Sequence, residues 1–228
     1  MTRQELEFEL APGACVLFTA RAHGNLSSVG GDGCEQAEHA RERLIKDLGL
    51  LALARGYQVH GTSVRWVAGI PSAAQPRAGV DDADGQATAL GGVGTMVLAA
   101  DCLPVALATE GAVAMLHAGW RGLAAGVLEE GVRALRERAP GQPLAALVGP
   151  GAGVCCYEVG AEVHAALGRA HARGTHADLR ALARQRLLAA GVERVQDVAA
   201  CTICDERFFS HRREGARAGR QAGVAWLS

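Results

Sequence analysis

The stretch AADCLPVALATEGAVAMLHAGWRG, residues 99–122, decides the fold of this chain. Its two apolar runs, residues 105–108 and 112–116, have the composition of buried β-strands. Glu110 and Gly111 separate the runs and are typical of a turn, so the stretch predicts a β-hairpin. Another strand-like run, residues 95–100, comes just before it. Polar residues are therefore held at the ends of strand-like segments.

Asp101 and Cys102 come directly after the run 95–100, and His117 comes directly after the run 112–116. His117 comes fifteen positions after Cys102, so a hairpin can bring the thiol and the imidazole together. Sulfur plus imidazole is a donor set for zinc or copper, and also a nucleophile–base pair. A buried Cys and a hydrogen-bonded core His would explain either residue alone. The neighbouring Trp120 and Arg121 favour a functional site, because polar groups are costly to bury without a role.

Composition bounds the class of protein. The 228 residues are 49% hydrophobic and carry a formal net charge of -1 without a basic block, so neither a nucleic-acid partner nor an anionic membrane surface is indicated. The first ten residues lack an apolar signal segment, and no apolar run approaches the ~20 residues of a membrane span. Seven Cys, an odd number, argue against a disulfide framework and for a reducing compartment. We expect a cytoplasmic protein.

Strand and helix patterns alternate along the whole chain without a linker or repeat. Strands are predicted at residues 14–19, 64–67, 144–148, 192–199 and 223–227, and helices at residues 35–48, 122–139, 161–170 and 177–190. This alternation predicts one α/β domain over residues 1–228, with a mixed sheet or two packed sheets flanked by helices.

Several polar residues outside the hairpin are candidates for a site. Arg121 precedes the predicted helix 122–139, whose N-terminus favours an anion, and its guanidinium would clamp a phosphate or carboxylate. Asp84 is a candidate acid. Ser210, His211 and Arg212 follow two Phe residues in a segment that is expected to be partly enclosed.

Two cysteine pairs lie outside the hairpin. Cys155 and Cys156 are adjacent and are interpreted as small packing residues. Cys201 and Cys204 form a C-x-x-C motif, which is typical of half a zinc ribbon or of a redox pair. Because no second pair lies at ribbon spacing and no helix opens on the motif, we favour a structural role for it. Whether this pair binds anything is left open.

Nine separate segments, in order, resemble the laccase-domain family, formerly called multicopper polyphenol oxidases and including the bacterial peptidoglycan-editing-factor type. The most specific are Asp-Cys-Leu-Pro and His-Ala-Gly-Trp-Arg-Gly. The matching segments are residues 58–61, 83–85, 100–105, 117–122, 149–150, 156–159, 201–202, 209–213 and 219–221.

The resemblance implies a zinc ion held by His60, Cys102 and His117, with a fourth tetrahedral position left open as in catalytic sites. It implies a fold of two mixed β-sheets layered between helices (α/β/β/α), similar to some cysteine-hydrolase toxins. Family members are described as zinc-dependent purine nucleoside phosphorylases with adenosine deaminase activity. The expected partners are therefore a purine nucleoside and phosphate, with the protein a monomer or homodimer.

Within that reading, Asp84, and after it Asp101, would shuttle a proton. Arg121 and Arg212 would hold phosphate, with Ser210 and His211 beside the substrate. Whether the role is purine salvage or cell-wall precursor editing stays open, as does the preferred nucleoside.

Three other functions remain alternatives. A metal-free cysteine hydrolase would use Cys102 as nucleophile and His117 as base, although His60 would then have no role. A copper-dependent polyphenol oxidase needs histidine-rich copper sites. The chain has eight His, of which two lie in the metal motifs, so copper would be adventitious. A zinc-stabilised scaffold without activity is the fourth reading.

Overall fold

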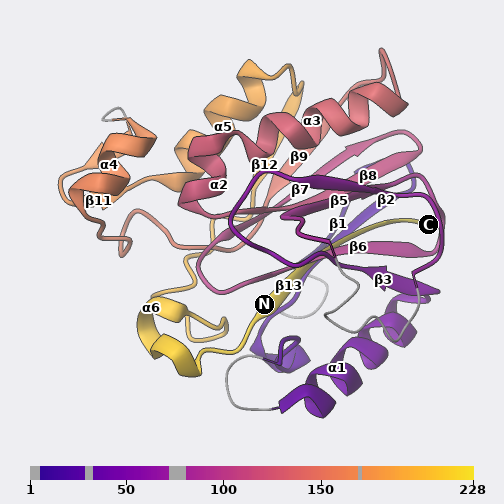
Figure 1. Cartoon of the computed structure of the whole chain (residues 1–228), viewed down its shortest axis with the longest axis horizontal. Coiled ribbons are helices and arrows are strands. Elements are labelled where there is room, and N and C mark those ends of the chain that lie inside the picture. The colour runs from indigo at the N-terminus through magenta and orange to yellow at the C-terminus, as the bar shows by residue number, and fades with distance from the viewer. Residues whose placement is uncertain (1–5, 29–32, 72–80, 169–170) are drawn as a thin grey trace.

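The computed structural model describes residues 6–28, 33–71, 81–168 and 171–228. Two β-sheets pack face to face, with helices on the outer face of each, so the layers run helix, sheet, sheet, helix (Figure 1). This confirms the expected α/β/β/α arrangement. Among the described residues, no helix is both long and apolar enough to cross a membrane.

The first sheet has five strands in the order β1-β2-β13-β6-β3. β13 lies at its centre and runs antiparallel to both β2 and β6, while the short β3 pairs in parallel with β6. Helix α1 lies on the outer side of this sheet (Figure 1). The elements are β1 Glu7–Ala11, β2 Ala14–Phe18, β3 Ala52–Ala54, β6 Val93–Ala99, β13 Gln221–Leu227 and α1 Gly33–Leu48.

The second sheet has six strands in the order β12-β9-β7-β8-β5-β4. β7 and β8 form the predicted hairpin, in which Val105 pairs with Leu116 and Pro104 pairs with His117. This register brings the start of β7 beside the end of β8. The strands are β4 Val64–Val67, β5 Gly85–Thr88, β7 Leu103–Thr109, β8 Ala112–Ala118, β9 Ala145–Val148 and β12 Arg194–Asp197.

Every residue of β7 and β8 is buried, because both faces of this hairpin are covered. Val105 and Leu107 belong to the core under the helices, whereas Ala106 and Ala108 belong to the core between the sheets. Because successive side chains of a strand point to opposite faces, β7 contributes residues to both cores. Burying a Val or Leu side chain contributes about 1.5–3 kcal/mol, so the hairpin links both cores energetically.

The predicted helix 122–139 is wrong in one respect, since the structure has two helices there: α2 Trp120–Ala125 and α3 Val127–Arg138. Gly126 separates them with φ 103°, a left-handed conformation that glycine adopts readily. α4 Ala161–Leu167 and α5 Leu179–Ala189 are shorter than predicted. The short elements are η2 Arg21–His23, β10 Ala172–Arg173, β11 His176–Ala177, α6 His211–Glu214 and η5 Gly215–Arg217.

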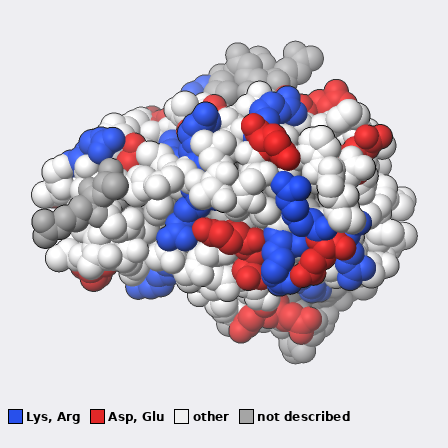
Figure 2. All heavy atoms as spheres, turned by 90° about the horizontal axis from the view of Figure 1, so that it is seen from above, with Lys and Arg blue, Asp and Glu red and all other residues white. Residues whose placement is uncertain are grey.

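The face over α3 and α5 carries both signs of charge. Figure 2 shows basic and acidic side chains interspersed there rather than gathered by sign. Arg133 pairs with Glu130 within α3, and Arg186 of α5 pairs with Glu129 of α3. These exposed ion pairs contribute little stability individually.

Candidate metal centre and active-site cavity

His60, Cys102 and His117 come together from three parts of the chain. His60 lies in the loop before β4, Cys102 in the turn between β6 and β7, and His117 near the end of β8. Their side-chain donor atoms all lie within 4.8 Å of one another. The two imidazole rings meet edge to face at 4.9 Å between centroids. The hairpin register therefore delivers the thiol and one imidazole, and the loop supplies the other imidazole.

Asp84 fixes the orientation of two of these residues. Its fully buried carboxylate lies 2.8 Å from Nδ1 of His117. The same carboxylate accepts backbone hydrogen bonds from Val59, His60 and Gly61, at 3.1, 2.9 and 2.7 Å. Nδ1 of His117 is thereby engaged, which leaves Nε2 for a metal, as in carboxylate–histidine–metal arrangements. The loop is held with His60 at φ 61°, a conformation that is rare for a non-glycine residue.

Two further contacts shape the loop and the floor of the site. Gln58 exchanges two hydrogen bonds with the backbone of Leu98, at 2.7 and 2.8 Å, so the loop is tied to β6. A Cβ added to Gly119 would lie 2.9 Å from Sγ of Cys102 and 3.1 Å from Cδ2 of His60. Gly119 thus leaves the room that the cluster occupies.

Cys102 and His117 form a charged pair in the absence of a metal. Burial by itself raises the pKa of Cys102, but the charge and hydrogen bond of His117, with a smaller contribution from His60, lower it to about 6. Burial by itself lowers the pKa of His117, but the Cys102 charge and the Asp84 hydrogen bond raise it to about 9. Burial opposes ionisation of Asp84 as well, yet the His117 and backbone hydrogen bonds keep its pKa below the usual value.

Asp101 performs a similar holding role on the other side of Cys102. It is buried with φ 86°, and its carboxylate accepts one hydrogen bond from Oγ1 of Thr202 and one from the backbone N–H of Arg212, both at 2.7 Å. The carboxylate therefore joins the Cys102 turn to two distant segments of the chain.

A cavity of about 930 Å³ opens over the three donors, within the size range of small-molecule sites. Four guanidinium-bearing residues line it: Arg41, Arg55, Arg212 and Arg220. Arg212 lies over the Tyr157 ring at 4.7 Å and donates to the Glu158 carbonyl. Burial lowers the pKa of Arg220, while the charges of Cys102 and Asp101 raise it. Four arginines thus share this cavity with the donor set.

Of these four arginines, the sequence predicts only Arg212 as a phosphate-binding residue. Arg220 lies in the family motif Gly-Arg-Gln, which was a usable signal. Arg41 and Arg55 lie in the helix α1 and just after β3, and nothing in their local sequence indicates a site. Their place in the cavity depends on how α1 and the first sheet pack beside the hairpin.

Two predicted phosphate or substrate residues lie elsewhere. Arg121 is exposed on α2, stacks at 4.3 Å over Trp120 and is absent from the cavity lining. Ser210 is fully buried, and its hydroxyl accepts a hydrogen bond from the Arg213 backbone as the N-cap of α6. His211 does line the cavity, with Nδ1 3.0 Å from the Gly215 carbonyl.

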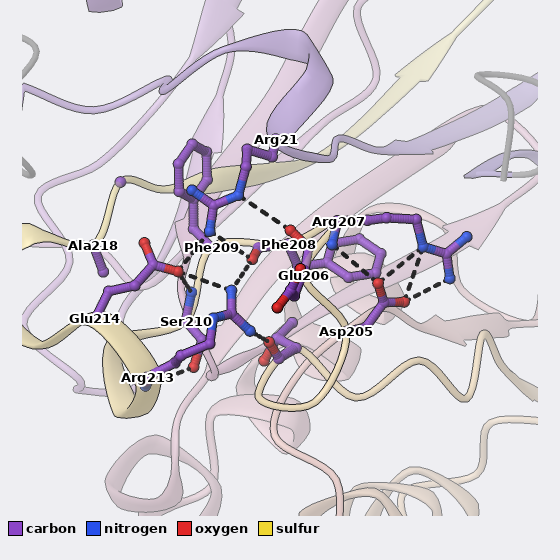
Figure 3. A network of polar contacts seen from close by, with 12 residues as sticks. Arg21, Asp205, Glu206, Arg207, Phe208, Phe209, Ser210, Arg213, Glu214 and Ala218 are labelled. Carbon is purple, nitrogen blue, oxygen red and sulfur yellow. Dashed lines mark hydrogen bonds and ion pairs between the residues drawn. The ribbon is translucent and has the colours of Figure 1, made fainter.

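The segment that carries Arg212 is anchored by a polar network (Figure 3). Glu214 pairs with Arg21 and with Arg213. Arg213 also donates to the backbone carbonyls of Thr202 and Phe208. α6 is thus fixed to η2 and to the 202–208 loop, and this fixes the backbone of Arg212.

The donor set fits a tetrahedral zinc ion. Zinc bonds of about 2.0–2.3 Å to imidazole nitrogen and thiolate sulfur place the donor atoms roughly 3.3–3.8 Å apart. Donors within 4.8 Å of one another reach this spacing by small side-chain shifts. Three protein donors leave one position open, which is the pattern of catalytic zinc.

A family model described as "Multi-copper polyphenol oxidoreductase laccase" matches residues 17–228. The chain belongs to this family. A solved family structure, the Neisseria meningitidis protein NMB0706, superposes with a TM-score of 0.83 at 34% identity, covering 98% of this chain and 99% of that one. YlmD from Geobacillus stearothermophilus gives the same TM-score at 30% identity, covering 94% and 92% of the two chains.

Curated relatives in the family carry the name purine nucleoside phosphorylase. One from Xylella fastidiosa strain Temecula1 is 43% identical over 221 residues, which cover 90% of this chain and 84% of the relative. YfiH of Escherichia coli K12, named purine nucleoside phosphorylase, is 36% identical over 217 residues, which cover 89% of this chain and 86% of the relative.

Proposed function

We propose that this protein is a zinc-dependent purine nucleoside phosphorylase. One observation carries the proposal: a His60, Cys102 and His117 donor set and four arginines share one cavity of about 930 Å³. The curated relatives named purine nucleoside phosphorylase support it. In the proposed reaction, phosphate attacks C1′ of adenosine or inosine, the glycosidic bond breaks, and the free base leaves with ribose 1-phosphate. Methylthioadenosine is a further candidate substrate.

The arginines are assigned to phosphate. The backbone N–H of Arg212 donates to the Asp101 carboxylate and its guanidinium donates to the Glu158 carbonyl, while Arg220 is half-buried near Cys102 and Asp101. Guanidinium groups bind phosphate with charge-assisted, often bidentate, hydrogen bonds. The bound anion would face the positive charge that develops on the ribose as the glycosidic bond breaks, which stabilises the transition state. Arg121 is outside the cavity lining and is not assigned to phosphate in this proposal.

Asp84 and Asp101 are assigned as positioning residues rather than proton carriers. Asp84 holds His117 and the His60 loop, and Asp101 holds the Cys102 turn through Thr202 and Arg212. Each carboxylate uses both oxygens as hydrogen-bond acceptors, and the donors around Asp84 keep its pKa below the usual value. Zinc, when bound by His60, Cys102 and His117, supplies Lewis-acid activation of an oxygen nucleophile.

Adenosine deamination is proposed as a second reaction of the same cavity, with water as the nucleophile, inosine as product and ammonia as leaving group. Trp120 and Tyr157 line the cavity and offer aromatic surfaces against which a purine can stack.

The test is turnover by the zinc-loaded full chain of inosine and adenosine in phosphate buffer. The proposal expects hypoxanthine or adenine together with ribose 1-phosphate, dependent on phosphate and lost in His117→Ala. Inosine formed from adenosine without phosphate would report the deaminase reaction. Absence of base release with zinc restored would overturn the proposal.

A metal-free cysteine hydrolase is the second candidate, and the lowered pKa of Cys102 beside His117 favours it. It would keep its activity in a chelator and lose it on alkylation of Cys102, whereas the phosphorylase would lose activity in the chelator. The description of the family model raises copper oxidation as well. Among the described residues, the groups able to hold a metal contain two histidines, His60 and His117, which is too few for a multicopper centre.

A further inference from the structure

Four cysteines that are far apart in sequence gather at the end of the six-stranded sheet. β9 and β12 are parallel neighbours, so the segments that follow them emerge side by side, and Gly151 forms a bridge with Cys201. The sulfur atoms of Cys155, Cys156, Cys201 and Cys204 all lie within 4.8 Å of one another. All four are free thiols. The expectation of a packing role is therefore wrong for Cys155, which is exposed beside Cys204.

The sulfur spacing is that of a metal site. Sγ of Cys155 lies 3.8 Å from Sγ of Cys204 and 3.5 Å from Sγ of Cys156. Zinc–sulfur bonds of about 2.3 Å in a tetrahedron place the sulfurs roughly 3.8 Å apart. Disulfide bonding would instead require about 2.05 Å between two of them. These two separations are close to those of a tetrathiolate, and all four sulfurs lie within 4.8 Å of one another.

Gly153 leaves room for the sulfur atoms, and its backbone N–H points toward one of them. A Cβ on Gly153 would lie 3.1 Å from Sγ of Cys201 and 3.2 Å from Sγ of Cys155. The Gly153 N–H donates to Sγ of Cys201 at 3.2 Å. Such a hydrogen bond to sulfur stabilises the thiolate form that a metal requires.

Two arginines fix the segments that carry the cysteines. Arg180 donates to the carbonyls of Gly151 and Ala200, one from each segment. Arg213 donates to the carbonyls of Thr202 and Ile203, between the two cysteines of the C-x-x-C motif. These two side chains therefore hold the backbone that positions the cysteines.

We propose that Cys155, Cys156, Cys201 and Cys204 bind a second zinc ion as a closed, structural tetrathiolate site. Thiolate sulfur selects soft metals, and four protein donors leave no position for a substrate, unlike the His60, Cys102 and His117 set. The role follows from one contact: Thr202, between two of the ligands, donates to Asp101 beside Cys102. The structural ion would therefore fix the loop 201–204, and this loop fixes the Cys102 turn through the hydrogen bond of Thr202 to Asp101.

Metal content tests the proposal with the full-length protein kept reduced and freed of weakly bound metal. We expect two zinc ions per wild-type chain and one in His60→Ala/His117→Ala. We also expect one in Cys155→Ser/Cys204→Ser and two in the matched control Cys34→Ser, which removes an exposed thiol outside both clusters. X-ray absorption of His60→Ala/His117→Ala should show only sulfur donors, at about 2.3 Å.

A measurement on the wild-type protein guards against a variant that fails to fold. With zinc bound, Cys155 and Cys204 should react with a thiol reagent at least tenfold more slowly than Cys34, and a chelator should abolish the protection. Equal reactivity with and without the chelator would overturn the proposal. So would iron in place of zinc, or a Cys155–Cys204 disulfide in the reduced preparation. In the His60→Ala/His117→Ala variant, metal content and X-ray absorption report only the four-cysteine site. These measurements therefore test the second zinc site even if the phosphorylase proposal fails.

Discussion

Oδ1 of Asp84 lies 2.8 Å from Nδ1 of His117, and both side chains are buried. The same carboxylate binds the backbone N–H groups of Val59, His60 and Gly61. One buried acid therefore sets the orientation of one imidazole donor and the backbone of the other. Cys102, the third donor, is placed by the hairpin and by Asp101.

Asp84→Asn should weaken zinc binding at the His60, Cys102 and His117 set by about 10–100-fold, the usual cost of removing such a partner. The amide keeps the size of the side chain but has one oxygen instead of two to accept the four N–H groups. Zinc affinity measured by competition with a chelator checks this. Asp82→Asn, an exposed neighbour, is the control and should bind zinc as the wild type does. Unchanged affinity in Asp84→Asn would contradict the role given to Asp84.

Gly119→Ala should reduce metal binding at this set at least tenfold although no donor is altered. The added methyl group would lie 2.9 Å from Sγ of Cys102, so the sulfur must move or the turn must shift. Zinc content after dialysis is the measurement. Gly69→Ala is the matched control, because a Cβ there meets nothing within 4 Å. If both variants retain equal zinc, the close approach at Gly119 does not matter.

Alkylation of metal-free protein should report the low pKa of Cys102. The thiolate is the reactive form, and it persists down to the pKa of about 6. The rate should therefore stay nearly constant from pH 8 to about pH 7 and fall through pH 6 as the thiol becomes protonated. The rate constant for Cys102 across this range, followed by mass spectrometry, checks the prediction, and added zinc should suppress the reaction. A midpoint near the ordinary value of 9.0 would rule out the charged pair with His117.

Arg212→Ala should raise KM for phosphate by roughly 10–100-fold, the loss expected from one or two charge-assisted hydrogen bonds of about 1.5–3 kcal/mol. Arg121→Ala should leave it unchanged, because Arg121 stacks on Trp120 outside the cavity lining. Initial rates of base release against phosphate concentration separate the two. A larger effect from Arg121 than from Arg212 would reverse the assignment.

Glu214→Gln should destabilise the protein at neutral pH by up to about 1 kcal/mol, a modest amount because the pair with Arg21 is partly exposed. Burial alone would raise the pKa of Glu214, but the hydrogen bonds of Arg21 and Arg213 hold it below the usual value of 4.5. Its stabilisation is therefore present above pH 4.5 and is lost as pH falls through the lower, folded-state pKa. Urea unfolding of both proteins should differ at pH 7 and converge in acid; a constant difference would exclude this linkage.

The sequence by itself determined the hairpin and the residues with donor side chains. Apolar runs and a Glu-Gly turn are local signals, and they predict a hairpin that can bring Cys102 and His117 together, as the Pro104–His117 pairing then does. The family motifs added His60 and the layered fold. The motifs also contain Arg212, Asp84 and Asp101. They do not indicate which groups the two carboxylates bind.

Only the tertiary structure decided which charged and sulfur-bearing residues meet. Arg41 and Arg55 reach the cavity because α1 and the first sheet pack beside the hairpin, whereas Arg121 is turned outward by the helix that starts at Trp120. The four cysteines gather because β9 and β12 are parallel neighbours. Local pattern fixes which face of an element is buried, but contacts between distant segments depend on how sheets and helices stack, and no short-range periodicity encodes that.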